Sequence, residues 1–191
     1  GLIAAGHDEA LGGMRLPKLV EAASFLFFQA ANIATAAYPF LTVANANLLV
    51  AHGTPAQIDA FARPELEGRY FGTMCLSEPQ AGSSLSDIAT RADFECDSPL
   101  GPRYRLTGNK MWISGGEHEL TENIVHLVLA KIPDEHGRLL PGPRGISLFI
   151  VPKYLPGTDG AAQGEHNDVV LAGLNHKMGY RGTTNCLLNF G

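Results

Sequence analysis

The hydrophobic and polar positions of this chain change their period near residue 70. Before that point, apolar residues recur every three or four positions, which is the spacing of one face of an α-helix. These positions are Leu19, Ala22, Ala23, Leu26, Phe27, Ala30, Ile33, Ala34 and Ala37. Pro17 stands where a first helical turn accepts proline. The pattern therefore predicts a helix over about residues 17–37.

Two shorter helices are expected next. Residues 41–52 are apolar enough for a second helix, and Gly53 follows as a stop signal. Thr54 and Gln57 have the spacing of a capping box, with Pro55 at the first helical position. Residues 1–67 are therefore predicted to be part of a helical domain.

Beyond Tyr70 the apolar period shortens towards two, the period of a β-strand. The expected strands cover residues 70–76, 89–96, 104–106, 110–114, 124–132, 146–151, 169–174 and 186–190. Gly108 suggests a hairpin turn over residues 105–110. Many short strands without intervening helices predict an antiparallel β-barrel or sandwich over residues 68–191. The fold class is therefore α+β, a helical segment followed by a β domain.

Composition narrows the class of protein. The chain has 191 residues, of which 45% are hydrophobic and 17% charged, so it can bury a core. A net charge of −5 with scattered Lys and Arg argues against nucleic acid as a partner. Three widely spaced cysteines predict no disulfide and no zinc site, as in a reducing compartment. No apolar run is expected to reach the length of a membrane span, and we expect no signal peptide, hence a cytoplasmic protein.

The first candidate site is the loop Ser77–Ser84, which follows a predicted strand. At a strand end, backbone amides that the sheet no longer uses can point at a ligand. The loop lacks the glycine and lysine pattern of a phosphate loop and the GxGxxG of a dinucleotide fold. An ordinary polar turn remains the alternative interpretation.

The second candidate is the segment Lys110–Gly116, with the sequence KMWISGG. It holds the only tryptophan, Trp112, two positions before Ser114, so both would lie on one face of a strand. The glycine pair that follows would allow close approach of a planar ligand. A core aromatic beside a strand-end serine is the alternative.

Together these segments resemble the acyl-CoA dehydrogenase family. Residues 74–83, MCLSEPQAGS, resemble its T/S-E-P-x-A-G-S signature, and residues 106–114, LTGNKMWIS, resemble its second signature. Residues 145–151 and 177–184 are similar to two further family segments, so the resemblance covers residues 70–191. Residues 116–130, GEHELTENIVHLVLA, resemble the branch that acts on methylthiopropanoyl-CoA and long-chain thioesters.

The resemblance implies that residues 68–191 are the middle domain, which holds the flavin of FAD. The amide of Leu76 and the hydroxyl of Ser77 would hydrogen-bond the pyrimidine edge of the isoalloxazine ring. Ser83 would meet the pyrophosphate, and Gly82 would allow close backbone approach there.

The resemblance also assigns roles to the second segment. Trp112 would lie against the flavin, opposite the substrate, and Ser114 would donate near N5 and O4 of the ring. The chain departs from many members by Ser77 in place of Thr, by Met74 in place of an aromatic, and by Gln80 in place of Gly.

No catalytic base can be assigned. In the family this base is a glutamate of the C-terminal helical domain, whereas this sequence runs from Gly1 to Gly191. We therefore expect a piece of a longer enzyme, inactive in isolation. Glu78 is expected to orient its turn by accepting backbone amides. The stretch Glu117–Glu119 has no metal-ligand spacing, so no metal is predicted.

The resemblance implies a function for the intact protein. It would be a FAD-dependent oxidoreductase of fatty acid β-oxidation that dehydrogenates an acyl-CoA thioester. Its electron acceptor would be an electron-transfer flavoprotein or similar protein, and the enzyme would be a homo-oligomer. The alternative is a non-catalytic β-rich module whose hydroxyl loops contact protein or sugar.

Overall fold

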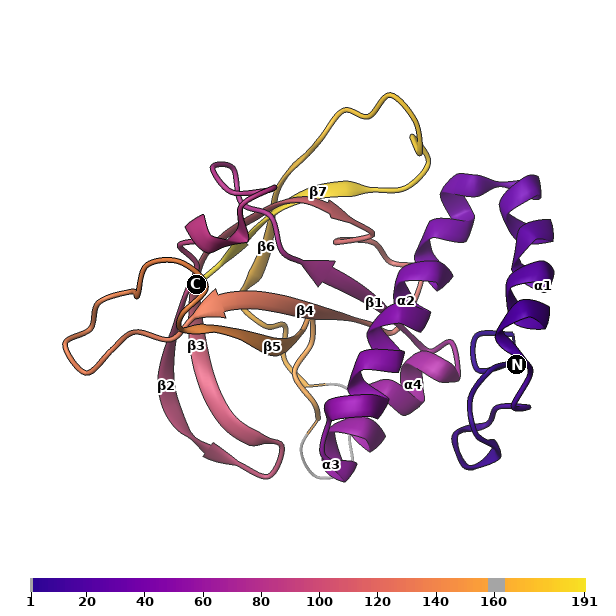
Figure 1. The fold of residues 1–191 in the computed structure, drawn as a ribbon, viewed down its shortest axis with the longest axis horizontal. Helices are drawn as coiled ribbons and strands as arrows, with labels where there is room; N and C mark the ends of the chain where they lie inside the picture. The colour runs from indigo at the N-terminus through magenta and orange to yellow at the C-terminus, as the bar shows by residue number, and fades with distance from the viewer. Residues whose placement is uncertain (1, 158–163) are drawn as a thin grey trace.

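The structure, a computed structural model, describes residues 2–157 and 164–191. In Figure 1 helices α1 to α4 gather at one side of the β domain, and α2 lies between α1 and the strands. The helical elements are η1 (Glu9–Leu11), α1 (Lys18–Ala31), α2 (Ile33–His52), α3 (Pro55–Gln57), η2 (Ile58–Ala62), α4 (Arg63–Leu66) and η3 (Leu85–Asp87). The strands are β1 (Tyr70–Cys75), β2 (Arg91–Ser98), β3 (Gly101–Ser114), β4 (Asn123–Lys131), β5 (Ile146–Pro152), β6 (Val169–Leu174) and β7 (Asn185–Phe190).

The predicted helix over residues 17–37 is two helices, which corrects its boundary. Asn32 has an extended backbone, and its side-chain oxygen accepts a hydrogen bond from the amide of Thr35 at 3.0 Å. This is an N-cap, which satisfies an amide that the first turn leaves free. Helix α2 therefore begins at Ile33 and continues through Pro39 to His52, merging the tail of the first predicted helix with the second.

Helix α2 contains 20 residues and is apolar enough, by length and composition alone, to cross a membrane. The expectation that no apolar run reaches this length is therefore wrong. The helix instead packs against β1, and the Asn45 side-chain amide donates to the carbonyls of Thr73 in β1 (3.0 Å) and Val125 in the neighbouring β4 (2.8 Å). A Cβ at Gly72 would lie 2.5 Å from Cβ of Asn45, so glycine is needed for this close approach. These contacts are those of a core helix.

The predicted capping box is confirmed at the start of α3. The Thr54 hydroxyl accepts from the Gln57 amide, and the Gln57 side chain accepts from the Thr54 amide. The helical run α3, η2 and α4 follows directly, and it buries Phe61, Ala62 and Leu66.

The α+β class is confirmed, and the pairing of the strands is mixed. The sheet has the order β1-β4-β2-β3-β7-β6, and β5 also pairs with β4. The β1–β4 and β2–β4 pairs are parallel, and the other pairs are antiparallel. The seven strands of the described residues do not close into a barrel. Within the described residues, the three-residue turn η3 is the only helical element between strands.

The hairpin predicted at Gly108 is wrong, because β3 runs without a break from Gly101 to Ser114. The turn that joins β2 to β3 lies earlier, between Ser98 and Gly101. Gly108 has φ +147°, and a Cβ there would lie 2.9 Å from Cα of Thr90. Glycine inside this strand therefore marks a close approach of two backbones and no turn.

Candidate functional site

The first candidate residues lie where the chain leaves β1. The carbonyl oxygen of Leu76 accepts a hydrogen bond from Nζ of Lys110 at 3.0 Å. The carbonyl oxygen of Ser77 accepts one from the amide of Met111 at 2.9 Å. Both donors belong to β3, so the structure brings the start of the first candidate segment against the second.

A buried ion pair fixes the loop that follows. Nζ of Lys110 lies 2.8 Å from Oε1 of Glu78, and their side chains are 0% and 3% exposed. The Glu78 carboxylate also accepts the amides of Ala89 (2.7 Å) and Thr90 (3.0 Å). The predicted role of Glu78, orienting its turn through backbone amides, is confirmed, with the lysine as an additional partner.

These contacts set the charge of Glu78. Burial alone would raise the pKa of its carboxyl group, but Lys110, Thr90 and Ala89 donate hydrogen bonds that outweigh burial and lower the pKa to about 2. Glu78 is therefore an anion at neutral pH. An anionic carboxylate already paired in this way is a structural anchor, because its oxygens are occupied.

The last part of the loop, Gly82 to Ser84, is exposed. Ser83 is exposed, and a Cβ built at Gly82 would meet no atom within 4 Å. In the part of the chain that the structure describes, no hydrogen bond engages the hydroxyl of Ser77 or of Ser83. Such unpaired hydroxyls beside open backbone can hydrogen-bond a polar or anionic group.

Trp112 lies on the surface, which removes the alternative of a core aromatic. Its side chain is 52% exposed, and its φ is +66°. The register of β3 against β7 shifts between Lys110 and Ile113, so Trp112 stands in a β-bulge and not in a regular strand. Bulges re-aim side chains and are common beside binding sites, and positive φ is costly for a bulky residue.

Ser114 lies at the end of β3. Its hydroxyl oxygen accepts a weak hydrogen bond from the Asn185 side chain at 3.3 Å. The next residue, Gly115, donates its amide to the carbonyl of Thr184 at 2.8 Å. Nζ of Lys177 lies 5.9 Å from the centre of the Trp112 ring. The segment between β6 and β7 therefore borders the end of β3.

Sequence reasoning missed the residues that hold this site together. Lys110 lies in the quoted second motif, but its pairing with Glu78 joins positions 32 residues apart and needs the topology of the sheet. Tyr38, whose hydroxyl accepts from the amide of Thr184 at 3.1 Å, lies 146 residues away in a helical pattern without a polar signal.

The stretch Glu117–Glu119, which precedes β4, forms a charged cluster with Lys153. Nζ of Lys153 donates to the carboxylates of Glu117 and Glu119. Burial would lower the pKa of Lys153, but these two carboxylates outweigh it and raise the pKa. Among residues 2–157 and 164–191, no group of three or more His, Cys, Asp and Glu side chains is arranged to hold a metal ion.

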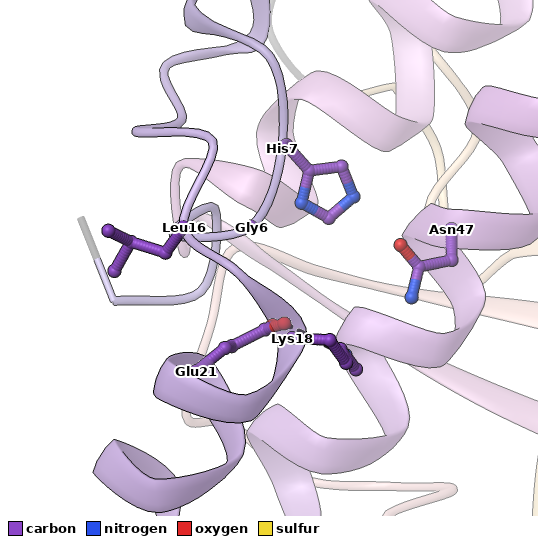
Figure 2. Close-up of a pocket in the computed structure, with 6 residues that line it drawn as sticks. All are labelled: Gly6, His7, Leu16, Lys18, Glu21 and Asn47. Carbon is purple, nitrogen blue, oxygen red and sulfur yellow. Dashed lines mark hydrogen bonds and ion pairs between the residues drawn. The ribbon is translucent and has the colours of Figure 1, made fainter.

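A cavity of about 360 Å³ lies away from these residues, between the N-terminal segment, α1 and α2. Figure 2 shows His7 and Asn47 pointing towards one another across it, with Lys18 and Glu21 below. Gly6 and Leu16 complete its lining. It contains none of the residues that the sequence singled out, so it is separate from the candidate site.

Comparisons with known proteins match the chain to one family. The family model described as "Acyl-CoA dehydrogenase, middle domain" matches residues 73–191. A 3-methylmercaptopropionyl-CoA dehydrogenase of Ruegeria pomeroyi is 39% identical over 96% of this chain and 30% of its own length. A broad-specificity linear acyl-CoA dehydrogenase of Mycobacterium tuberculosis is 37% identical over 97% of this chain and 29% of its own length.

A solved structure of the same family has a similar fold. An acyl-CoA dehydrogenase of Bacillus anthracis, complexed with FAD, superposes with a TM-score of 0.75 and 25% identity, over 100% of this chain and 28% of its own. The chain thus spans less than a third of the length of these relatives. Its family model match and its identity to the two curated dehydrogenases together show that the chain belongs to the acyl-CoA dehydrogenase family.

Proposed function

We propose that this chain is the flavin-holding part of a longer FAD-dependent acyl-CoA dehydrogenase. In this proposal, residues 1–67 belong to the N-terminal helical domain and residues 68–191 form the middle β domain. The exposed apolar side chains of α1 support a larger protein, since none of its residues is buried and Leu19 and Phe27 are 81% and 80% exposed. Apolar surface of this kind normally packs against another element.

The observation that carries the proposal is the meeting of the two candidate segments. The Met111–Ser77 backbone hydrogen bond places the free hydroxyl of Ser77 beside the bulge that exposes Trp112. An exposed indole in a strained backbone conformation, next to unpaired hydroxyls, suits a planar heterocycle with polar edges.

The first segment fits the polar parts of FAD. The Leu76 amide and the Ser77 hydroxyl would donate to the pyrimidine edge of the ring, and fixed donors there stabilise negative charge. Gly82 and Ser83 would hold the pyrophosphate, because the backbone at Gly82 faces open space and the Ser83 hydroxyl is unpaired.

The second segment fits the ring. Trp112 would cover one face, and Ser114 would donate near N5 and O4, with its oxygen still accepting from Asn185. FAD, when bound, supplies the hydride acceptor for the α,β-dehydrogenation of an acyl-CoA thioester. The residues of this chain would bind and orient the ring and exclude water from it.

The remaining parts of the proposal concern the intact protein. Its substrate would be an acyl-CoA of β-oxidation, its acceptor an electron-transfer flavoprotein or similar protein, and its assembly a homo-oligomer. A cytoplasmic location is proposed on the three free cysteines, Cys75, Cys96 and Cys186. Membership of the family leaves the alternative of a non-catalytic binding module without support.

The test is to purify the full-length protein and record its visible spectrum, then add acyl-CoA thioesters of increasing chain length without oxygen. We expect a bound flavin spectrum that bleaches with at least one thioester. Trp112→Ala should lower the flavin content of the purified protein, whereas His136→Ala, an exposed substitution in the loop between β4 and β5, should not. Protein that purifies without flavin and takes up no added FAD would contradict the proposal.

A further inference from the structure

We propose that Tyr38 of α2 is a positioning residue for the flavin-facing end of β3. The inference rests on the proposed function and goes beyond it, since Tyr38 belongs to the helical segment and touches none of the predicted flavin contacts. It would instead hold the backbone on which Ser114 stands.

The hydroxyl of Tyr38 fixes a peptide that β3 also uses. Tyr38 is 7% exposed, and its Oη accepts the amide of Thr184 at 3.1 Å. On its other side, Thr184 accepts the amide of Gly115 through its carbonyl at 2.8 Å. Thr184 is thus held between the helix and the residue that follows Ser114.

The ring of Tyr38 fixes the same place sterically. A Cβ at Gly115 would lie 3.2 Å from Cδ1 of Tyr38, so the ring covers this glycine, whose φ is +65°. The ring is itself held, because Phe71 stacks on it at 6.0 Å and His118 meets it edge-on at 5.1 Å between centroids. A side chain so confined has little freedom to change rotamer.

A second contact joins α2 to the same segment. The hydroxyl of Thr183 donates to the carbonyl oxygen of Ala34 at 2.6 Å, one turn before Tyr38. Thr183 is 6% exposed, so this bond is shielded from water. Together the two contacts tie residues 183–184 to α2.

The position of Thr184 affects both residues that are predicted to contact the flavin ring, Ser114 and Trp112. Asn185, directly after Thr184, donates to Ser114, so the placement of Thr184 controls the hydrogen-bond partner of that hydroxyl. Trp112 lies two residues before Ser114 in a bulge, which lacks regular ladder bonds to hold it. The orientation of these groups therefore depends on α2 through Tyr38.

The experiment is Tyr38→Phe in the full-length holoenzyme, which removes the hydroxyl and keeps the ring. A hydrogen bond of ordinary strength predicts that the dissociation constant of FAD rises by about 2- to 10-fold. The flavin midpoint potential and visible spectrum should also shift, because the Ser114 donor loses its fixed position. Thr183→Val, which breaks the second contact, should act in the same direction.

The matched control is Tyr104→Phe, the same chemical change at a tyrosine of β3, the strand that carries Ser114. The Tyr104 ring packs edge-on against Phe94 and Phe149, ten residues before Ser114. It should leave the FAD affinity, the potential and the spectrum unchanged.

Unchanged FAD affinity, potential and spectrum in both Tyr38→Phe and Thr183→Val would overturn the inference. If these variants only lower the unfolding temperature, equally with and without FAD, Tyr38 is a structural residue and the inference is also wrong. Both outcomes require a wild-type protein that holds FAD. Absence of FAD binding by the wild type would instead refute the proposed function.

Discussion

The two halves of the proposed flavin site are held by different forces. The hydroxyl loop, Ser77–Ser84, is anchored by a charge pair buried beneath it, Lys110 and Glu78. The β3 end, Trp112–Gly115, is anchored by neutral hydrogen bonds and by the ring of Tyr38. The hydroxyls of Ser77 and Ser83 are unpaired and Trp112 is exposed, while neighbouring buried residues fix the backbone of both halves.

Because the forces differ, the two halves should respond to different substitutions and conditions. A buried ion pair is costly to break on one side, because the remaining charge is left without compensation in a poorly solvated place. Neutral hydrogen bonds are individually weaker and do not respond to pH. The hydroxyl loop should therefore respond to charge substitutions and acid, and the β3 end to changes in shape and backbone conformation.

The largest effect is expected for Lys110→Met. It leaves the Glu78 carboxylate buried and without its cation, which should lower the free energy of unfolding by about 3–5 kcal/mol. Urea or guanidinium unfolding measures this loss.

Its control is the double variant Lys110→Met with Glu78→Gln, which removes both charges and should be less destabilised than the single variant. A single variant within about 1 kcal/mol of the wild type would show that the pair contributes little.

The next largest effect is a loss of folding stability at low pH. The pKa of Glu78 falls from 4.5 to about 2 in the folded protein, so the folded state favours the ionised form. The resulting stabilisation is complete above pH about 4.5 and is lost as the pH falls towards about 2. The wild type should therefore be more stable than Glu78→Gln at pH 5, and the difference between their free energies of unfolding should be smaller at pH 3. A constant difference between the two proteins over this range would contradict the assignment.

A smaller effect is expected at the bulge. Trp112 has φ +66°, so Trp112→Gly should be more stable than Trp112→Ala by roughly 1 kcal/mol, since only glycine adopts this conformation without strain. The matched control is the same pair of substitutions at Phe94, which is 58% exposed on β2 and does not have a positive φ. There Phe94→Gly should be less stable than Phe94→Ala. Thermal or chemical unfolding of the four variants measures both differences. Equal stability of the two Trp112 variants would remove backbone strain from the account.

The sequence predicted local features well. Alternating apolar positions located most strands, and Thr54 with Gln57 predicted the capping box that the structure contains. Where it failed, a side chain or a distant neighbour decided the outcome. Asn32 capped a new helix inside a continuous apolar pattern, and Gly108 met the backbone of Thr90.

The site shows the same limit. Its residues stand in two short motifs, and these could be found without a structure. The ion pair of Lys110 with Glu78, the parallel pairing of β1 with β4, and the contact of Tyr38 with Thr184 join distant positions, which no local pattern encodes. The bulge at Trp112 also broke the regular alternation that the sequence suggested.

The contact between Trp112 and the flavin can be tested directly, because Trp112 is the single tryptophan of these 191 residues. Because Trp112 is the only indole, its fluorescence in the 191-residue chain reports on the β3 end alone. If Trp112 covers the flavin, FAD should quench this emission in a saturable titration, with the same dissociation constant that flavin fluorescence polarisation gives. FAD binding seen by polarisation without any change in Trp112 emission would show that this residue does not cover the flavin.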